Sequence, residues 1–127
     1  MKAKKKVKKR ILYAEDYAAL RQGVVVMLKR KGYKVEPFEN GADLMLRLKD
    51  DAACDIVVTD NDMPILTGMG VLMAIKSDPA LKHLPVIVFS GDDMIRPRVA
   101  ELGGISVDKG NIGPLLDAIA KITPRAA

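Results

Sequence analysis

The sequence predicts a single α/β domain with a doubly wound, five-stranded parallel sheet and helices on both faces. Short apolar stretches alternate with stretches of helical periodicity five times, without an internal repeat or a linker. Strands that alternate with helices of this length form parallel sheets covered on both sides. The length of 127 residues suits one domain, and 49% apolar against 29% charged residues excludes disordered and collagen-like chains.

The first strand and helix follow from residue type and spacing. The apolar run at 11–14 is typical of a strand buried on both faces. After it, apolar residues recur at i, i+4, i+7 and i+8, at Leu20, Val24, Met27 and Leu28. Basic residues at 29–31 and then Gly32 are typical of a helix end.

A second strand, a second helix and a third strand are expected next. Residues 33–38 form the weaker strand candidate. Asn40 should cap a helix that runs to about Lys49, because its side-chain oxygen can accept a backbone N–H of the first turn. Residues 56–59 are β-branched throughout, which favours a strand.

The alternation continues to the end of the chain. Thr67 should cap a helix that ends near Lys76, and a strand follows at 86–89. A helix is expected over about 93–102, with Pro97 tolerated only in its first turn. A short strand at 105–107 and a helix capped by Asn111, with Pro114 early and its end near Ile122, complete the domain.

The net charge of +5 comes from the N-terminus. Seven of the 21 basic residues lie in residues 2–10, and residues 11–127 carry 14 basic against 16 acidic residues, a net of −2. We expect a basic tail over 1–9, the domain over 10–123 and a short tail over 124–127. No apolar stretch of a signal peptide or a membrane helix follows the basic residues, and Cys54 has no cysteine to pair with. These features indicate a cytoplasmic location.

Candidate functional groups follow four of the five predicted strands. Glu15 and Asp16 follow the first strand, Asp60 the third, Ser90 the fourth and Lys109 the fifth. The carboxyl ends of parallel strands share one edge, where doubly wound sheets bind their ligands. The sequence therefore predicts that three carboxylates, a hydroxyl and an ammonium group converge there.

This combination suits phosphoryl transfer. Clustered carboxylates resist full ionisation unless a cation joins them, and oxygen ligands with open positions suit Mg²⁺. A carboxylate can also act as a nucleophile and form an aspartyl-phosphate. Lys109 and Ser90 would supply a cation and a hydrogen-bond donor for the oxygens of the transferred group.

The same residues resemble the motifs of response-regulator receiver domains over about residues 9–123. The matching features are the acidic pair at 15–16, the element Asp-x-x-Met-Pro-x-x-x-Gly from Asp60 to Gly68, Ser90 with the glycine after it, and Lys109. The resemblance implies the flavodoxin-like receiver fold and a role in two-component signal transduction.

The resemblance also implies a role for each site residue. Asp60 would accept a phosphoryl group from a sensor histidine kinase or a histidine phosphotransfer protein, Ser90 would close onto that group and Lys109 would pair with it. Such a regulator is not an enzyme beyond its own phosphorylation and dephosphorylation. No output domain is recognised, so we expect it to dock to a downstream protein or to relay phosphate, unless it is part of a longer protein.

The implied metal is Mg²⁺. Asp16 and Asp60 would bind it directly, Glu15 mostly through water, and Asp62 through its backbone carbonyl.

Two positions depart from the family pattern. Receivers usually carry Tyr or Phe three residues before the lysine, where this chain has Ser106, and proline after the lysine, where it has Gly110. These changes leave the phosphorylation chemistry intact but call into question the usual readout through the fourth helix and fifth strand.

One rival function is a haloacid-dehalogenase-like phosphatase, with Asp60 as nucleophile and Asp62 as general acid. Against it, this motif normally follows the first strand, and the acid expected after the lysine is present only as Asp117 within a helix. A nucleic-acid-binding role is not expected, except through the basic tail, because the rest of the chain is mildly acidic.

Overall fold

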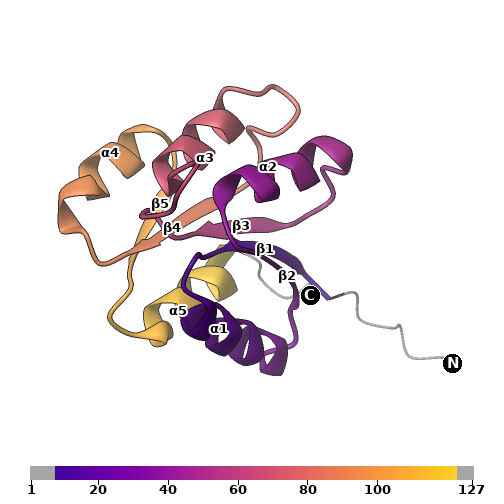
Figure 1. Cartoon of the computed structure of the whole chain (residues 1–127), viewed down its shortest axis with the longest axis vertical. Helices are drawn as coiled ribbons and strands as arrows, with labels where there is room; N and C mark the ends of the chain where they lie inside the picture. The colour runs from indigo at the N-terminus through magenta and orange to yellow at the C-terminus, as the bar shows by residue number, and fades with distance from the viewer. Residues whose placement is uncertain (1–7, 123–127) are drawn as a thin grey trace, which may run out of the picture.

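The computed structural model describes residues 8–122, which form a five-stranded parallel sheet flanked by helices on both faces (Figure 1). The spatial strand order is β2-β1-β3-β4-β5. The strands are β1 (Arg10–Ala14), β2 (Lys34–Phe38), β3 (Ile56–Thr59), β4 (Val86–Ser90) and β5 (Ile105–Asp108). The predicted fold class is therefore confirmed. Residues 1–7 of the expected N-terminal tail and the C-terminal residues 123–127 lie outside the described part of the chain.

Five α-helices connect and cover the strands. They are α1 (Ala18–Arg30), α2 (Gly41–Asp50), α3 (Gly68–Lys76), α4 (Arg96–Glu101) and α5 (Ile112–Ile122), with a 3₁₀ turn, η1 (Asp93–Ile95), before α4. Figure 1 shows α2, α3 and α4 on one face of the sheet and α1 and α5 on the other. No helix among residues 8–122 is long and apolar enough to span a bilayer.

The two faces of the sheet bury two hydrophobic clusters, because side chains alternate along each strand. On β1, Leu12 and Ala14 face the cluster under α2, α3 and α4, whereas Ile11 and Tyr13 face the one under α1 and α5. All four side chains are fully buried. The apolar run at 11–14 thus forms a strand whose side chains are buried on both faces of the sheet, as the sequence predicted.

The helix caps expected from the sequence are present. Asn40 and Thr67 accept hydrogen bonds from the backbone N–H groups of Asp43 and Gly70, at 2.8 and 3.1 Å. The segment expected as one helix over 93–102 instead begins as the 3₁₀ turn η1 and continues as α4. Pro97 lies in the first turn of α4, where its missing N–H costs no hydrogen bond within the helix.

The start of α3 lies directly against the backbone at the end of β3. A Cβ atom on Gly68 would lie 2.3 Å from the carbonyl oxygen of Asp60, a distance that real Cβ atoms do not reach. Glycine at position 68 therefore allows α3 to pack this close to the backbone of Asp60.

Gly68→Ala should lower the free energy of unfolding by about 1–3 kcal/mol, because the added methyl group must displace backbone rather than a flexible side chain. Gly23→Ala is a matched control. Gly23 lies inside α1 with nothing within 4 Å of its Cβ position, so alanine should stabilise the protein by about 0.5–1 kcal/mol. Urea unfolding of both variants measures the difference, and equal effects would contradict the close packing at Gly68.

Candidate functional site

The carboxyl ends of the strands bring the predicted site residues together. In the β1–β3 pairing Ala14 lies opposite Thr59, so the next residues, Glu15 and Asp60, leave the sheet at the same height. The backbone N–H of Asp60 also donates to the carbonyl of Ala14, at 3.0 Å. Carboxylate oxygens of Glu15, Asp16 and Asp60 lie within 4.8 Å of one another.

Lys109 connects two of these acids. Its Nζ lies 2.9 Å from Asp60 Oδ1 and 2.7 Å from Glu15 Oε1. The contact with Glu15 is an ion pair rather than a well-aligned hydrogen bond. The residue after β5 thus reaches across β4 to the acids that follow β3 and β1, as the order of the strands requires.

The acids differ sharply in their exposure to water. Glu15 and Asp60 are 0% and 4% exposed, whereas Asp16 is exposed. Burial raises the pKa of the Glu15 carboxyl, and the ion pair with Lys109 opposes that rise only in part. Burial alone would lower the pKa of Lys109, but its contacts with Glu15 and Asp60 outweigh burial and raise it. Lys109 is therefore held in its charged form.

Arg21 is a positioning residue that the sequence analysis did not identify. Its Nη1 donates to the backbone carbonyl of Glu15 at 2.7 Å and, more weakly, to that of Asp16 at 3.5 Å. From the first turns of α1 it thus holds the loop that carries both acids. The backbone N–H of Tyr17 further donates to Glu15 Oε2 at 3.2 Å. Nothing in the spacing of Arg21 distinguishes it from an ordinary basic residue of a helix.

Asn61 has a similar role in the loop after β3. Its backbone carbonyl accepts from the N–H groups of Met63 and Gly68, and its side-chain oxygen accepts from that of Met69, all at 3.1 Å. These bonds hold the loop that presents Asp60 against α3. Within the same loop Ile65 is 81% exposed and has a φ of 73°, a strained conformation for a β-branched residue.

Ser90 and Asp62, the remaining predicted residues, lie at the same end of the sheet. Ser90 is 5% exposed at the end of β4, and its Oγ accepts from the N–H of Asp92 at 3.1 Å. The backbone N–H of Lys109 donates to the Ser90 carbonyl at 3.3 Å, which joins the two loops. Asp62 is exposed, and among the described residues its carboxylate is not part of the acidic cluster.

The donor set fits Mg²⁺. The cluster holds three carboxyl groups and only one ammonium group, that of Lys109, and carboxylate oxygens are ligands that Mg²⁺ prefers. Asp16, the exposed member, keeps one side of the cluster open to solvent, as an ion that retains several waters requires.

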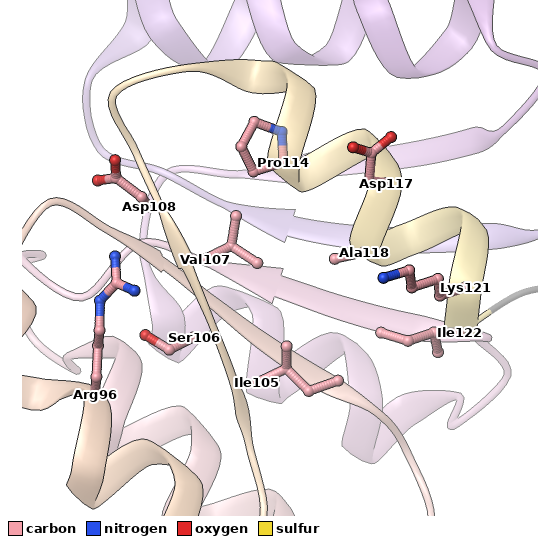
Figure 2. A pocket seen from close by; sticks show the side chains of 10 residues that line it. All are labelled: Arg96, Ile105, Ser106, Val107, Asp108, Pro114, Asp117, Ala118, Lys121 and Ile122. Carbon is pink, nitrogen blue, oxygen red and sulfur yellow. The ribbon is translucent and has the colours of Figure 1, made fainter.

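The outer edge of the sheet carries a separate hollow of about 540 Å³, which we call the β5 hollow (Figure 2). Ser106 lies in it beside Arg96 of α4, and α5 forms its other wall. Asp117 lies in that wall, apart from the carboxylate cluster. No large side chain from position 106 fills the space, because the residue there is serine.

Comparison with known proteins gives a consistent family assignment. The protein-family model of the response regulator receiver domain matches residues 11–105. The chain is 32% identical over 84 residues to the two-component response regulator ORR8 of Oryza sativa subsp. indica, covering 66% of this chain and 69% of the relative. It is 28% identical over 120 residues to the chemotaxis protein CheY of Pseudomonas aeruginosa, covering 91% and 97%.

Solved structures show the same fold. The response regulator TrrA of Thermotoga maritima, solved in complex with Mg²⁺-BeF, superposes with a TM-score of 0.79 at 23% identity. The match covers 90% of this chain and 98% of the other.

Lys109→Met should raise the pKa of the Glu15 carboxyl further, because Glu15 would lose its cation and stay buried. Carbon-13 NMR titration of the side-chain carboxyls in metal-free buffer measures this pKa. Lys82→Met, which removes an exposed lysine without an ion pair among residues 8–122, is the control and should leave it unchanged. An unaltered titration of Glu15 in the Lys109 variant would show that the ion pair does not govern the site.

Proposed function

Because this chain belongs to the response regulator receiver family, we propose that it receives a phosphoryl group on Asp60, in a Mg²⁺-dependent reaction, as a switch of a two-component system. The observation that carries the proposal is the cluster of Glu15, Asp16 and Asp60 with Lys109 in direct contact with Asp60. Proteins of this family are signalling regulators rather than conventional enzymes.

In the proposed reaction an Asp60 carboxylate oxygen attacks the phosphorus of a phosphohistidine. The phosphorus–nitrogen bond of the donor breaks as the acyl phosphate bond forms, and the imidazole leaves with the bonding electron pair. Lys109, already 2.9 Å from Asp60 Oδ1, offsets the negative charge that the phosphoryl oxygens bring. Ser90, joined to Lys109 through the backbone, supplies a hydroxyl donor to those oxygens.

The metal ligands in this proposal are Asp16 and Asp60, with Glu15 acting through water and Asp62 through its backbone carbonyl. Mg²⁺ bound there would neutralise charge on the phosphoryl oxygens. The Mg²⁺-BeF complex of TrrA, a protein of the same fold, supports this assignment. The phosphoryl donor would be a sensor histidine kinase or a histidine phosphotransfer protein. We also propose that the protein acts in the cytoplasm.

The structure favours this function over the phosphatase. The Asp62 carboxylate is exposed and lies outside the acidic cluster, so it is not positioned with Glu15 and Asp16 against the reacting carboxylate. Asp60 also follows the central strand β3, whereas the phosphatase motif normally follows the first strand.

Incubation with acetyl phosphate and Mg²⁺ should add the mass of one phosphoryl group to the protein, and the Asp60→Asn variant should gain none. Intact-mass spectrometry measures this, and omission of Mg²⁺ or the Asp16→Ala variant should reduce the gain strongly because the metal site is lost. Undiminished mass gain in Asp60→Asn would place the acceptor elsewhere.

Asp62→Asn is the matched control, since it removes a neighbouring exposed carboxylate. In a receiver it should still take up one phosphoryl group and change its lifetime only moderately. In the phosphatase it would remove a general acid and slow turnover of a phosphate ester roughly 10²–10⁴-fold.

The β5 hollow bears on how the phosphorylated state is read. For phosphorylation to change a distant surface, some part of the protein must be able to pack in two different ways. Ser106 is too small to fill the hollow in one state and leave it in the other (Figure 2). We therefore propose that partners read the rim around Ser90 and Lys109 rather than the outer face of α5.

Amide NMR shifts with and without beryllofluoride and Mg²⁺ should change strongly at residues 90–93 and 109–111, and only slightly along α5. The reason is that Ser106 provides no bulky group to transmit the change. Shifts along residues 112–122 as large as those at 90–93 would show that another residue carries the switch.

A further inference from the structure

The opposite end of the sheet carries a concentration of positive charge that the proposed phosphoryl site does not use. Seven basic residues meet where the strands begin and α1 ends, and we call them the basic surface: Lys8, Lys9, Arg10, Lys29, Arg30, Lys31 and Lys34. They come from three segments of the chain. The hydrogen bond from the N–H of Lys34 to the carbonyl of Lys9, at 2.9 Å, joins two of these segments.

None of these seven side chains forms an ion pair with another of residues 8–122. Arg10 and Lys34 are direct partners in the β1–β2 register, so like charges stand on neighbouring strands. Glu36, the next acid along β2, is already paired with Arg47 at 3.0 Å. The carboxylate of Asp55 lies at this edge and accepts the backbone N–H of Arg10, at 2.7 Å.

Helix capping does not account for this arrangement. Two cations in the last turn suffice to complement the carbonyl groups at the end of α1. The remaining five add repulsion between like charges, which an external anion would relieve. Side chains alternate along β1 and β2, so Arg10 and Lys34 project to the face that α2 covers, whereas Lys29, Arg30 and Lys31 lie at the end of α1 on the other face. The basic surface therefore extends around the β2 edge of the sheet.

The basic surface is concave at its centre. A groove of about 510 Å³ is lined by Lys8, Lys29 and Lys34 together with Tyr33 and Val35. A phosphodiester chain can enter such a groove and contact its three lysines, and the half-buried Tyr33 is the aromatic residue that lines it. A flat bilayer cannot enter it, and no exposed large apolar side chain lines it to serve as an anchor.

We propose that the basic surface binds the phosphate backbone of a nucleic acid. The partner is recognised by charge and not by sequence, because no helix or strand among residues 8–122 is placed to read base edges. In the sequence, four further lysines, Lys2, Lys4, Lys5 and Lys6, precede Lys8. This function is independent of Asp60, which lies at the other end of the strands.

Fluorescence anisotropy with a labelled oligothymidylate and a duplex of the same length tests the proposal on the full chain. Binding should weaken steeply between about 50 and 200 mM salt, as expected for phosphate contacts. The triple variant Lys29→Gln, Arg30→Gln, Lys34→Gln should weaken binding at low salt by about tenfold or more and lower the salt slope for the single strand by about 2.

The matched control is Lys49→Gln, Lys82→Gln, Lys121→Gln, which removes the same charge from exposed positions outside the basic surface, on α2, before β4 and on α5. It should retain nearly the binding of the parent protein. Circular dichroism and acetyl phosphate labelling should show that both triple variants remain folded and competent at Asp60.

Four results would overturn the proposal. The first is no binding of either oligonucleotide at low salt. The second is an equal loss in both triple variants, which would reflect net charge alone. The third is binding lost on neutralising Lys2, Lys4, Lys5 and Lys6 but unchanged in the Lys29–Arg30–Lys34 variant. The fourth is stronger retention on phosphatidylserine vesicles or polyglutamate than on nucleic acid, which would make the partner a membrane or an acidic protein.

Discussion

The ammonium group of Lys109, placed between two buried carboxylates, is the interaction on which the rest of the site depends. Glu15 and Asp60 are almost entirely removed from water, and a buried carboxylate without a partner costs several kcal/mol. Lys109 compensates both at 2.7 and 2.9 Å. With Asp16 included, the cluster still carries excess negative charge, so compensation by the protein is incomplete and attraction for a cation remains. The same few charged groups therefore affect both the stability of the fold and the binding of a cation.

Backbone contacts hold those charges in register. Arg21 binds the carbonyl groups of the loop after β1, Asn61 holds the loop after β3, and Gly68 lets α3 lie directly against Asp60. None of these three residues presents a reactive group. Their effect is to fix where the reactive groups point, since displacements of about 1 Å are costly in such sites.

The parallel sheet also separates the charges of the protein. All strands point the same way, so residues that follow the strands gather at one end and residues that precede them gather at the other. Strands of five residues span about 17 Å. The cluster of Glu15, Asp16 and Asp60 and the basic surface therefore lie at opposite ends of the sheet, and an anion bound at the basic surface does not meet these carboxylates.

By itself the sequence determined the alternation of strands and helices, the caps at Asn40 and Thr67, and the identity of the residues that follow each strand, because these depend on neighbours a few positions apart. The predicted convergence of Glu15, Asp60 and Lys109 rested on the strand rule and the family resemblance, and the structure confirms it with distances. Only the tertiary structure decided that the ammonium group of Lys109 contacts both Glu15 and Asp60, since these residues lie 45 or more positions apart in the sequence.

The basic surface is the feature for which sequence and structure differ most. In the sequence, the cations at 29–31 were typical of a helix end and those at 8–10 of a tail, so the two groups were interpreted separately. Parallel pairing of β1 with β2 brings Lys34 beside Arg10 and turns the end of α1 toward the same edge. Local patterns carry no information on this adjacency, because it arises from strand pairing between segments 24 residues apart.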